Sequence, residues 1–165
     1  MAQSFMHRSR VRKGAAFTFI EVMMVVVIIG ILAAMVIPSF SNVTSSADSS
    51  ALKGAVAGVR SSIAGYRAKA IMAGNQPYPT LAQLTTQGVV MQGELPVNPY
   101  TGLNAVQQVS VSDAASRRVS NAGSYGWNYA FDNSANPPTA TFYANSDKPT
   151  DVSNGAGGFK KANEL

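Results

Sequence analysis

The chain has 165 residues, no cysteine and one histidine, and its 13 Lys and Arg outnumber its eight Asp and Glu. The lack of cysteine excludes disulfides, thiol catalysis and Cys metal sites. The histidine, His7, lies close to the N-terminus, so the rest of the chain has no imidazole base and no His ligand for a metal. We therefore predict that the protein is not an enzyme and that it has no catalytic residue, no metal ligand and no cofactor.

The net charge of +5 is concentrated at the N-terminus. Arg8, Arg10, Arg12 and Lys13 lie within residues 1–16, which contain no acid, and the remainder of the chain is close to neutral. The basic pairs at 117–118 and 160–161 are predicted to lie on the solvated surface. Because no basic patch remains, we expect no nucleic-acid partner.

An apolar segment follows the basic residues. Residues 22–37 carry no charge, and the stretch from 15 to 37 exceeds the roughly 20 residues that a helix needs to cross a bilayer. The basic flank predicts a single span with its N-terminus in the cytoplasm. A secretory signal peptide cut after Ser41 is the alternative, but the apolar run is long for one and would contain Glu21.

Glu21 is an acid inside this apolar region. A charge within a bilayer is costly, and such groups in membrane segments are by default functional. A single anchored helix gains nothing from a carboxylate there. We therefore predict that Glu21 contacts another subunit, with the amides of its own helix N-terminus as the alternative partners.

The sequence around Glu21 resembles the class III signal of type IV prepilins and of type II secretion pseudopilins. The resemblance rests on residues 13–22, KGAAFTFIEV, and extends to Pro38, which falls where many members of the family carry a proline. In that family a membrane prepilin peptidase removes a basic leader that ends in a small residue. The new N-terminal residue, usually Phe, is N-methylated, and a Glu stands four residues after it, as Glu21 stands four after Phe17.

One departure from the family pattern concerns the cleavage point. The leader usually ends in Gly directly before Phe, whereas Ala15 and Ala16 stand here between Gly14 and Phe17. The interval to Glu21 favours cleavage between Ala16 and Phe17, followed by methylation of Phe17. Cleavage after Gly14 is the alternative.

The resemblance implies an α+β, pilin-like fold. A long N-terminal helix would have its first half in the membrane and its second half packed against a small antiparallel β-sheet head. The subunits would polymerise through this helix, with Phe17 and Glu21 at the contact, into a homo-oligomeric helical filament. Its partners would be prepilin peptidase, minor pilins or pseudopilins and an inner-membrane assembly platform. The chain would lie in the bacterial inner membrane with a periplasmic head before it enters the envelope filament.

The resemblance leaves the type of filament open. A pseudopilin of a type II secretion system is favoured by the small head, by the proline-containing loop at residues 94–102 and by a terminal hairpin. A type IV pilus pilin, major or minor, for adhesion, motility or DNA uptake is the alternative. A solitary membrane-anchored binding domain at the envelope is a third function, and it leaves Glu21 without a role.

The long helix is predicted to follow the leader, residues 1–16, in two parts. Residues 17–38 form the transmembrane half and residues 39–73 the amphipathic half, with a kink at Pro38 because proline lacks an amide donor and clashes with the preceding turn. Apolar side chains recur at helical spacing in the second half, which predicts a stripe that the head covers. The stripe comprises Leu52, Val56, Val59, Ile63, Tyr66 and Ala70.

Residues 74–145 are predicted to form the α+β head. Thr80 and Gln83 fit a capping box for a short helix that runs through Leu84. Strands are predicted at residues 105–111, 125–131 and 139–144, and the loop at 132–138 would join the last two as a hairpin. Trp127 and Tyr129 are predicted to pack on the helix stripe rather than to form a carbohydrate platform, and Gly54 and Gly58 to allow close packing of the sheet on the helix.

Residues 146–165 contain one aromatic side chain and a glycine-rich run, which predict a flexible tail. In major pseudopilins a calcium ion often stabilises a loop near the C-terminus. Asp147, Asp151 and Asn154 offer oxygen ligands for such an ion, but their spacing matches no pattern that can be carried over. We predict a solvated polar tail without calcium and keep the ion as the alternative.

Overall fold

A computed structural model describes residues 17–165, except for the side chains of residues 37–42. The chain divides into two units, one up to Phe40 and the other Ser41–Leu165, and each is described by itself. The elements follow the order α1–α2–β1–α3–β2–β3–β4–β5–η1, where η1 is a short 3-10 helix. The fold is α+β and pilin-like, as the sequence predicts, and its sheet is mostly antiparallel.

Helix α1, Phe19–Met72, begins in the first unit and ends in the second. Its backbone is helical through residue 38, so the proline does not end the helix. The side chain of Pro38 lies outside the described residues, and the predicted kink stays a prediction. In the first unit every described side chain from residue 17 to 36 is exposed.

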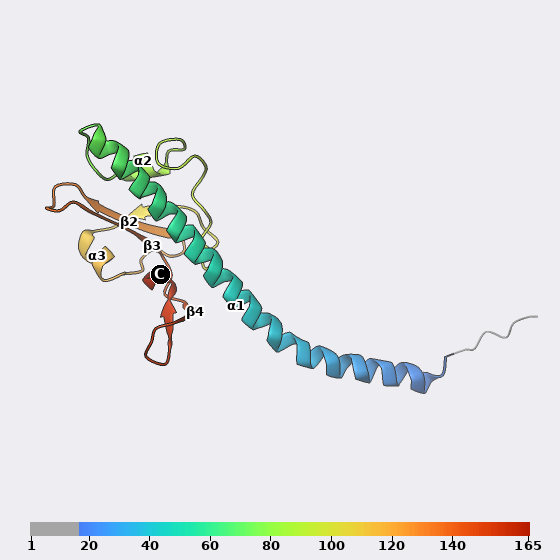
Figure 1. Ribbon diagram of the computed structural model, residues 1–165. Coiled ribbons are helices and arrows are strands. Elements are labelled where there is room, and N and C mark those ends of the chain that lie inside the picture. The colour runs from blue at the N-terminus through green and yellow to red at the C-terminus, as the bar shows by residue number, and fades with distance from the viewer. Residues whose placement is uncertain (1–16) are drawn as a thin grey trace, which may run out of the picture. The chain divides into compact units, whose positions relative to one another are not determined.

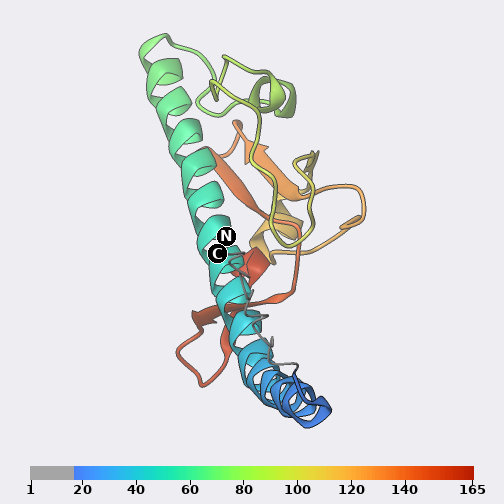
Figure 2. The ribbon, with the colours of Figure 1, turned by 90° about the vertical axis from the view of Figure 1, so that its right-hand side faces the viewer.

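The predicted stripe on α1 forms one wall of the core of the second unit. Leu52, Val56, Val59 and Ile63 are buried against the sheet, and Figures 1 and 2 show this part of α1 running alongside β2 and β3. Burying an aliphatic side chain of this size contributes about 1.5–3 kcal/mol to folding. The stripe therefore holds the head on the helix.

The main sheet has the strand order β1–β2–β3. Strands β2, Trp127–Asp132, and β3, Thr139–Ala144, pair antiparallel and confirm the predicted hairpin. Strand β1, Val106–Gln108, pairs parallel with β2 and is shorter than the predicted strand at 105–111. The chain leaves the sheet at Ser110, whose hydroxyl accepts from the N–H of Asp113 and thereby caps α3, Val111–Ala115.

Three aromatic side chains fill the space between α1 and the sheet. Trp127, Tyr129 and Phe142 are each at most 1% exposed, and the ring centroids of Trp127 and Phe142 lie 5.2 Å apart. The polar atoms of the first two are satisfied: Trp127 Nε1 donates to Pro96 O at 2.8 Å, and the Tyr129 hydroxyl donates to Pro79 O at 2.8 Å. Both aromatic residues therefore serve the core, as predicted, and offer no face to a sugar.

The connections before the sheet are fixed by polar side chains. Helix α2, Leu81–Thr85, starts with the predicted capping box between Thr80 and Gln83. In the proline-containing loop, the buried Asn98 side chain donates to Gly126 O at 2.7 Å, and its backbone N–H donates to Leu103 O at 2.9 Å. The first bond attaches the loop to the residue before β2, and the second closes the turn from Asn98 to Leu103.

The C-terminal segment differs from the predicted flexible tail. Strands β4, Pro149–Ser153, and β5, Phe159–Lys161, form a second sheet, and η1, Ala162–Glu164, follows with Ala162 buried. The hairpin attaches to α1 because the N–H of Asp151 donates to the buried Ser49 hydroxyl at 3.0 Å. Hydrogen bonds to residues far away in the sequence order this segment. Its composition does not reveal these bonds, so the prediction of a flexible tail was wrong.

Gly54 and Gly58 also differ from the prediction. Both are exposed, and a Cβ atom added at either would meet nothing within 4 Å. They lie on a side of α1 that the sheet does not cover, whereas the larger side chains of the stripe meet the sheet. The close packing predicted for these two glycines is therefore wrong within this chain.

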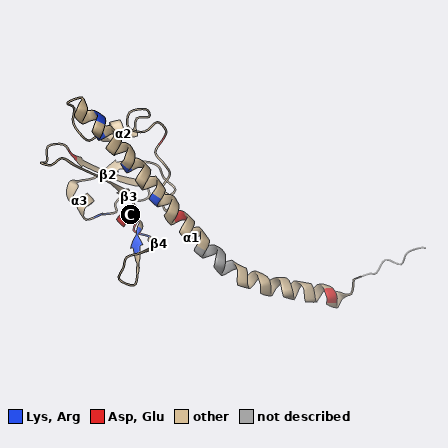
Figure 3. Cartoon of the chain, viewed as in Figure 1, with Lys and Arg blue, Asp and Glu red and all other residues tan. Residues whose placement is uncertain are grey.

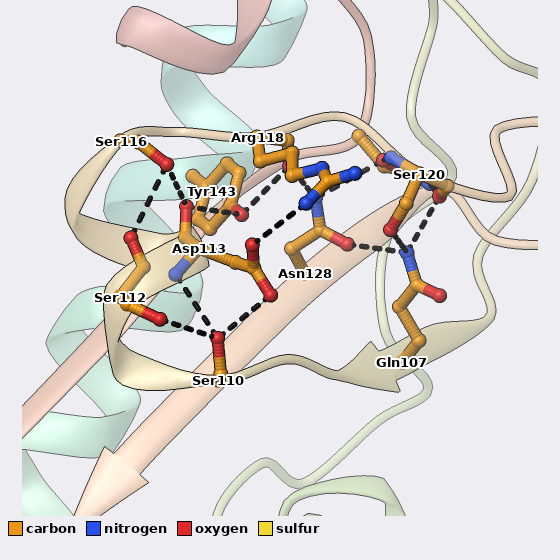
Figure 4. A network of polar contacts seen from close by, with 10 residues as sticks. Gln107, Ser110, Ser112, Asp113, Ser116, Arg118, Ser120, Asn128 and Tyr143 are labelled. Carbon is orange, nitrogen blue, oxygen red and sulfur yellow. Dashed lines mark hydrogen bonds and ion pairs between the residues drawn. The ribbon is translucent and has the colours of Figure 1, made fainter.

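A polar network fixes the long loop between α3 and β2 (Figure 4). Gln107 Nε2 donates to Ser120 O at 2.6 Å and to Asn128 Oδ1 at 2.7 Å. Asn145, which is fully buried, accepts from Ser120 N–H at 3.1 Å and from Asn128 Nδ2 at 3.0 Å, and it donates to Ser120 O and Tyr125 O. Gln107 and Asn145 therefore bind the loop at Ser120, and both are joined to Asn128 on β2.

Replacing Asn145 by Ala is expected to lower the free energy of unfolding of the head by about 2–4 kcal/mol, because it leaves several buried partners unpaired. Urea titration of the full chain in detergent, followed by the fluorescence of Trp127, measures this change. Asn104 is exposed, so Asn104→Ala is the matched control and should stay within about 0.5 kcal/mol of wild type. A similar loss in both variants would contradict the role of the network.

Candidate functional site

The candidate site lies at the start of α1, where Glu21 caps its own helix. The Oε2 atom of Glu21 accepts from the N–H of Thr18 at 2.8 Å and from the Thr18 hydroxyl at 2.8 Å. In return, the N–H of Glu21 donates to Thr18 Oγ1 at 3.3 Å. This reciprocal arrangement is a capping box, and it satisfies amides that the first helical turn leaves without partners.

The capping box leaves part of the carboxylate available. Both bonds from Thr18 reach Oε2, and Oε1 accepts no hydrogen bond from any described residue. Glu21 forms no ion pair with a described residue either, since the ion pair found among the described residues joins Arg118 and Asp113 in the second unit. The carboxylate can therefore receive a cation from outside the chain while it still caps the helix.

The helix that carries Glu21 offers an unbroken apolar surface. Residues Phe19–Val36 have a mean hydropathy of 2.8, and none of this window is buried. By length and composition, this is the described helix that could cross a membrane. Figure 3 shows one acidic segment near the beginning of α1, followed by ribbon without a charged residue up to the part drawn in grey. Such a surface requires lipid or other protein chains to cover it.

The predicted site residues divide into described and undescribed ones. Gly14, Ala15 and Ala16 lie outside the described residues, so their cleavage stays a prediction. Phe17 is 84% exposed and lies beside the capping box that holds Glu21. Thr18 is the partner that the sequence reasoning did not name, although the spacing Thr-x-x-Glu before an apolar run is the signature of a capping box.

Two of the three residues considered as calcium ligands, Asp151 and Asn154, have hydrogen-bond partners within the chain. Asn154 Oδ1 already accepts from the N–H groups of Ala156 and Gly158 at 2.8 and 3.0 Å. Hydrogen bonds with Ser49 and then Ser46 hold the pKa of Asp151 below its usual range, which engages that carboxylate on α1. Among the described residues, no group of three or more His, Cys, Asp or Glu side chains could hold a metal ion.

Comparison with known proteins gives one match, at the N-terminus. The model of the family described as prokaryotic N-terminal methylation motif matches residues 11–37, which include Gly14, Phe17 and Glu21. No curated protein and no solved structure matches the chain. Residues 11–37 therefore carry a type IV pilin-like prepilin signal. This signal supports a structural, membrane-anchored filament subunit that prepilin peptidase processes.

Proposed function

We propose that the chain is a pseudopilin, a structural subunit of the filament of a type II secretion system. Prepilin peptidase removes residues 1–16, Phe17 is methylated, and the mature subunit polymerises through the first half of α1. The observation that carries the proposal is the position of Glu21, four residues after Phe17 on a helix whose apolar side chains are all exposed from residue 19 to 36. The match to the methylation motif supports it.

The apolar surface of α1 supplies the adhesion in this proposal. An isolated helix of this kind is covered by lipid while the subunit waits in the membrane, and by other α1 helices once the subunit enters the filament. Packing of apolar side chains has no preferred axial position by itself. A specific polar contact is therefore needed to set the stagger between neighbouring subunits.

Glu21 provides this contact by pairing with Phe17 of an adjacent subunit. Cleavage gives Phe17 a positive α-amino group, and N-methylation retains the charge. In one chain Phe17 precedes α1 and stands four residues before Glu21, an interval that corresponds to about 6 Å of rise where it is helical. A neighbour displaced along the filament axis brings its amino group beside Glu21, where the attraction offsets the cost of removing both charges from water. The capping box with Thr18 holds the carboxylate in place for this pair.

The type of filament is a finer part of the proposal. The small head, the proline-containing loop at 94–102 and the terminal hairpin of the head, β2–β3, support a pseudopilin. A type IV pilus pilin shares the same signal and the same helix, so its subunit contact would be the same.

Deletion of the gene in the native host tests the function. We expect loss of secreted proteins from the culture medium with surface pili retained, and restoration by the wild-type gene but not by the Glu21→Ala gene. Normal secretion with loss of pili would instead indicate a pilus pilin. Normal secretion together with normal pili would contradict a filament role of either kind.

A further inference from the structure

A cavity of about 270 Å³ lies in the second unit between α1 and β3. Arg60 and Arg67 line it from α1, Arg117 lines it from the loop after α3, and Phe142 closes it from β3. We name it the arginine pocket after its three basic residues. Its remaining walls are mostly apolar or aromatic and include no acidic side chain.

No Asp or Glu side chain among the described residues holds the three arginines in place. Arg60 donates from Nε and Nη2 to Phe142 O at 3.0 and 2.9 Å, and from Nη1 to Leu165 O at 2.8 Å. The guanidinium group of Arg67 lies over the ring of Tyr78, with its Cζ atom 5.2 Å from the ring centroid. Leu165 is the last residue, so its oxygen partly compensates the charge of Arg60. Arg67 and Arg117 form no ion pair with a described residue, and their positive charges face the pocket without a counter-charge.

Arg117 is the least satisfied of the three. Its guanidinium group lies over the ring of Tyr143, and its Nη1 atom is buried without a hydrogen-bond partner among the described residues. A guanidinium group has five N–H donors, and a buried donor without an acceptor is costly. An anion in the pocket would supply an acceptor.

The backbone conformation of Arg117 is further evidence that its side chain has a function. The residue has a φ of 54°, in the left-handed region that favours glycine. It follows α3 in a Schellman motif, in which the N–H of Arg117 donates to Ala114 O at 3.2 Å and the N–H of Arg118 donates to Asp113 O at 2.9 Å. Glycine is usual at this position, so the backbone of Arg117 is strained. Strained residues of this kind cluster at functional sites, which suggests that the Arg117 side chain has a function.

The charges of the pocket act on one another. Burial, and then the charge of Arg117, lower the pKa of Arg60 from its ordinary value. Three like charges around a partly enclosed cavity favour a counter-ion that can accept several hydrogen bonds at once. Carboxylate and phosphate oxygens meet this requirement, and the planar guanidinium fork matches their geometry.

We propose that the arginine pocket, formed by Arg60, Arg67 and Arg117, is a binding site for the carboxylate or phosphate group of an anionic ligand. Ile63 and Ala64 also line the pocket, between Arg60 and Arg67 on α1, and can contact a small apolar portion of that ligand. The site belongs to the head and is separate from the contact at Glu21, so it adds ligand binding to the function of the subunit.

Calorimetric titration of the full chain in neutral detergent tests the pocket. The probes are inorganic phosphate and citrate, each added at constant ionic strength set with sodium chloride. The test variants are Arg117→Gly and Arg67→Gln, and the matched control is Arg118→Gln, because the Arg118 side chain is 70% exposed and lies outside the pocket. Glycine suits the backbone at position 117, so the first variant should fold at least as well as wild type.

We expect saturable binding of at least one probe, weakened about tenfold or more in each test variant and unchanged in the control. Binding of phosphate alone or of citrate alone would assign the ligand to that chemistry. No saturable binding of either probe would overturn the proposal, as would equal binding by wild type and by a folded Arg117→Gly chain. A melting curve of each variant verifies that it is folded.

Discussion

Replacing Glu21 by Gln is expected to leave membrane insertion intact and to reduce filament yield by at least about tenfold, because the charge that pairs with Phe17 of a neighbour is lost. Glutamine is accepted at this position of a capping box, so the substitution preserves the helix start and removes only the charge. Membrane fractionation measures insertion, and electron microscopy with quantification of sheared filaments measures assembly. Glu21→Ala should show the same loss, since it removes both the charge and the cap.

Two controls separate charge pairing from helix capping. Thr18→Ala removes the hydroxyl that contacts Glu21 but keeps the carboxylate, so its filament yield should stay within about twofold of wild type. A Glu21→Ala subunit keeps a normal amino terminus, so it should enter filaments beside wild-type subunits better than it assembles alone. Full assembly of Glu21→Gln together with failure of Thr18→Ala would show that Glu21 acts as a cap and not as a charge partner.

Replacing Phe142 by Ala is expected to lower the free energy of unfolding of the head by about 3–5 kcal/mol. Phe142 is 1% exposed and its ring stacks on that of Trp127, so the substitution leaves a cavity at the centre of the core. The backbone carbonyl that binds Arg60 is retained. Trp127 is the only tryptophan of the chain, and its fluorescence during urea titration reports the unfolding of the head.

Phe159 provides the matched control for the core. It is an aromatic residue on β5 that is 62% exposed, so Phe159→Ala should change the free energy of unfolding by no more than about 0.5 kcal/mol. Equal and small effects of the two substitutions would contradict the assignment of Phe142 to the core. A large effect of Phe159→Ala alone would place the packing of the head at the β4–β5 hairpin instead.

Local signals in the sequence were sufficient for the elements that depend on periodicity and caps. The stripe from Leu52 to Ala70 follows from helical spacing, because burial on one face of a helix requires apolar side chains every three or four residues. The α2 capping box follows from Thr80 and Gln83, and the β2–β3 hairpin follows from two strand patterns around a turn-rich loop. Each of these features depends on residues close together in the chain.

The features that were missed depend on contacts between distant residues. The C-terminal hairpin is attached by Ser49 and Asp151, which lie far apart in sequence, and Arg60 joins Phe142 to Leu165. A polar segment with few apolar residues gives no local sign of such bonds. The parallel pairing of β1 with β2 could not be predicted for the same reason. It depends on which strands become neighbours in the sheet, and the residue pattern within each strand does not specify its neighbour.

The candidate site was found from sequence because its signal is short and local. Glu21 is conspicuous in an apolar segment, and it stands four residues after Phe17. The arginine pocket could not be predicted in this way. Its residues come from α1 and from the loop after α3, and only the packing of α1 on the sheet brings Arg117 to the same cavity as Arg60 and Arg67.

The intact mass of the mature protein, purified from membranes of a host that has prepilin peptidase, tests whether the chain is processed as a filament subunit. We expect a chain that begins at Phe17 and carries one added methyl group, which tandem mass spectrometry would locate on the α-amino nitrogen. A chain that begins at Ala15 would contradict the cleavage site between Ala16 and Phe17. A chain that begins at Asn42, or one that retains residues 1–16 in the presence of active peptidase, would contradict the filament-subunit function itself.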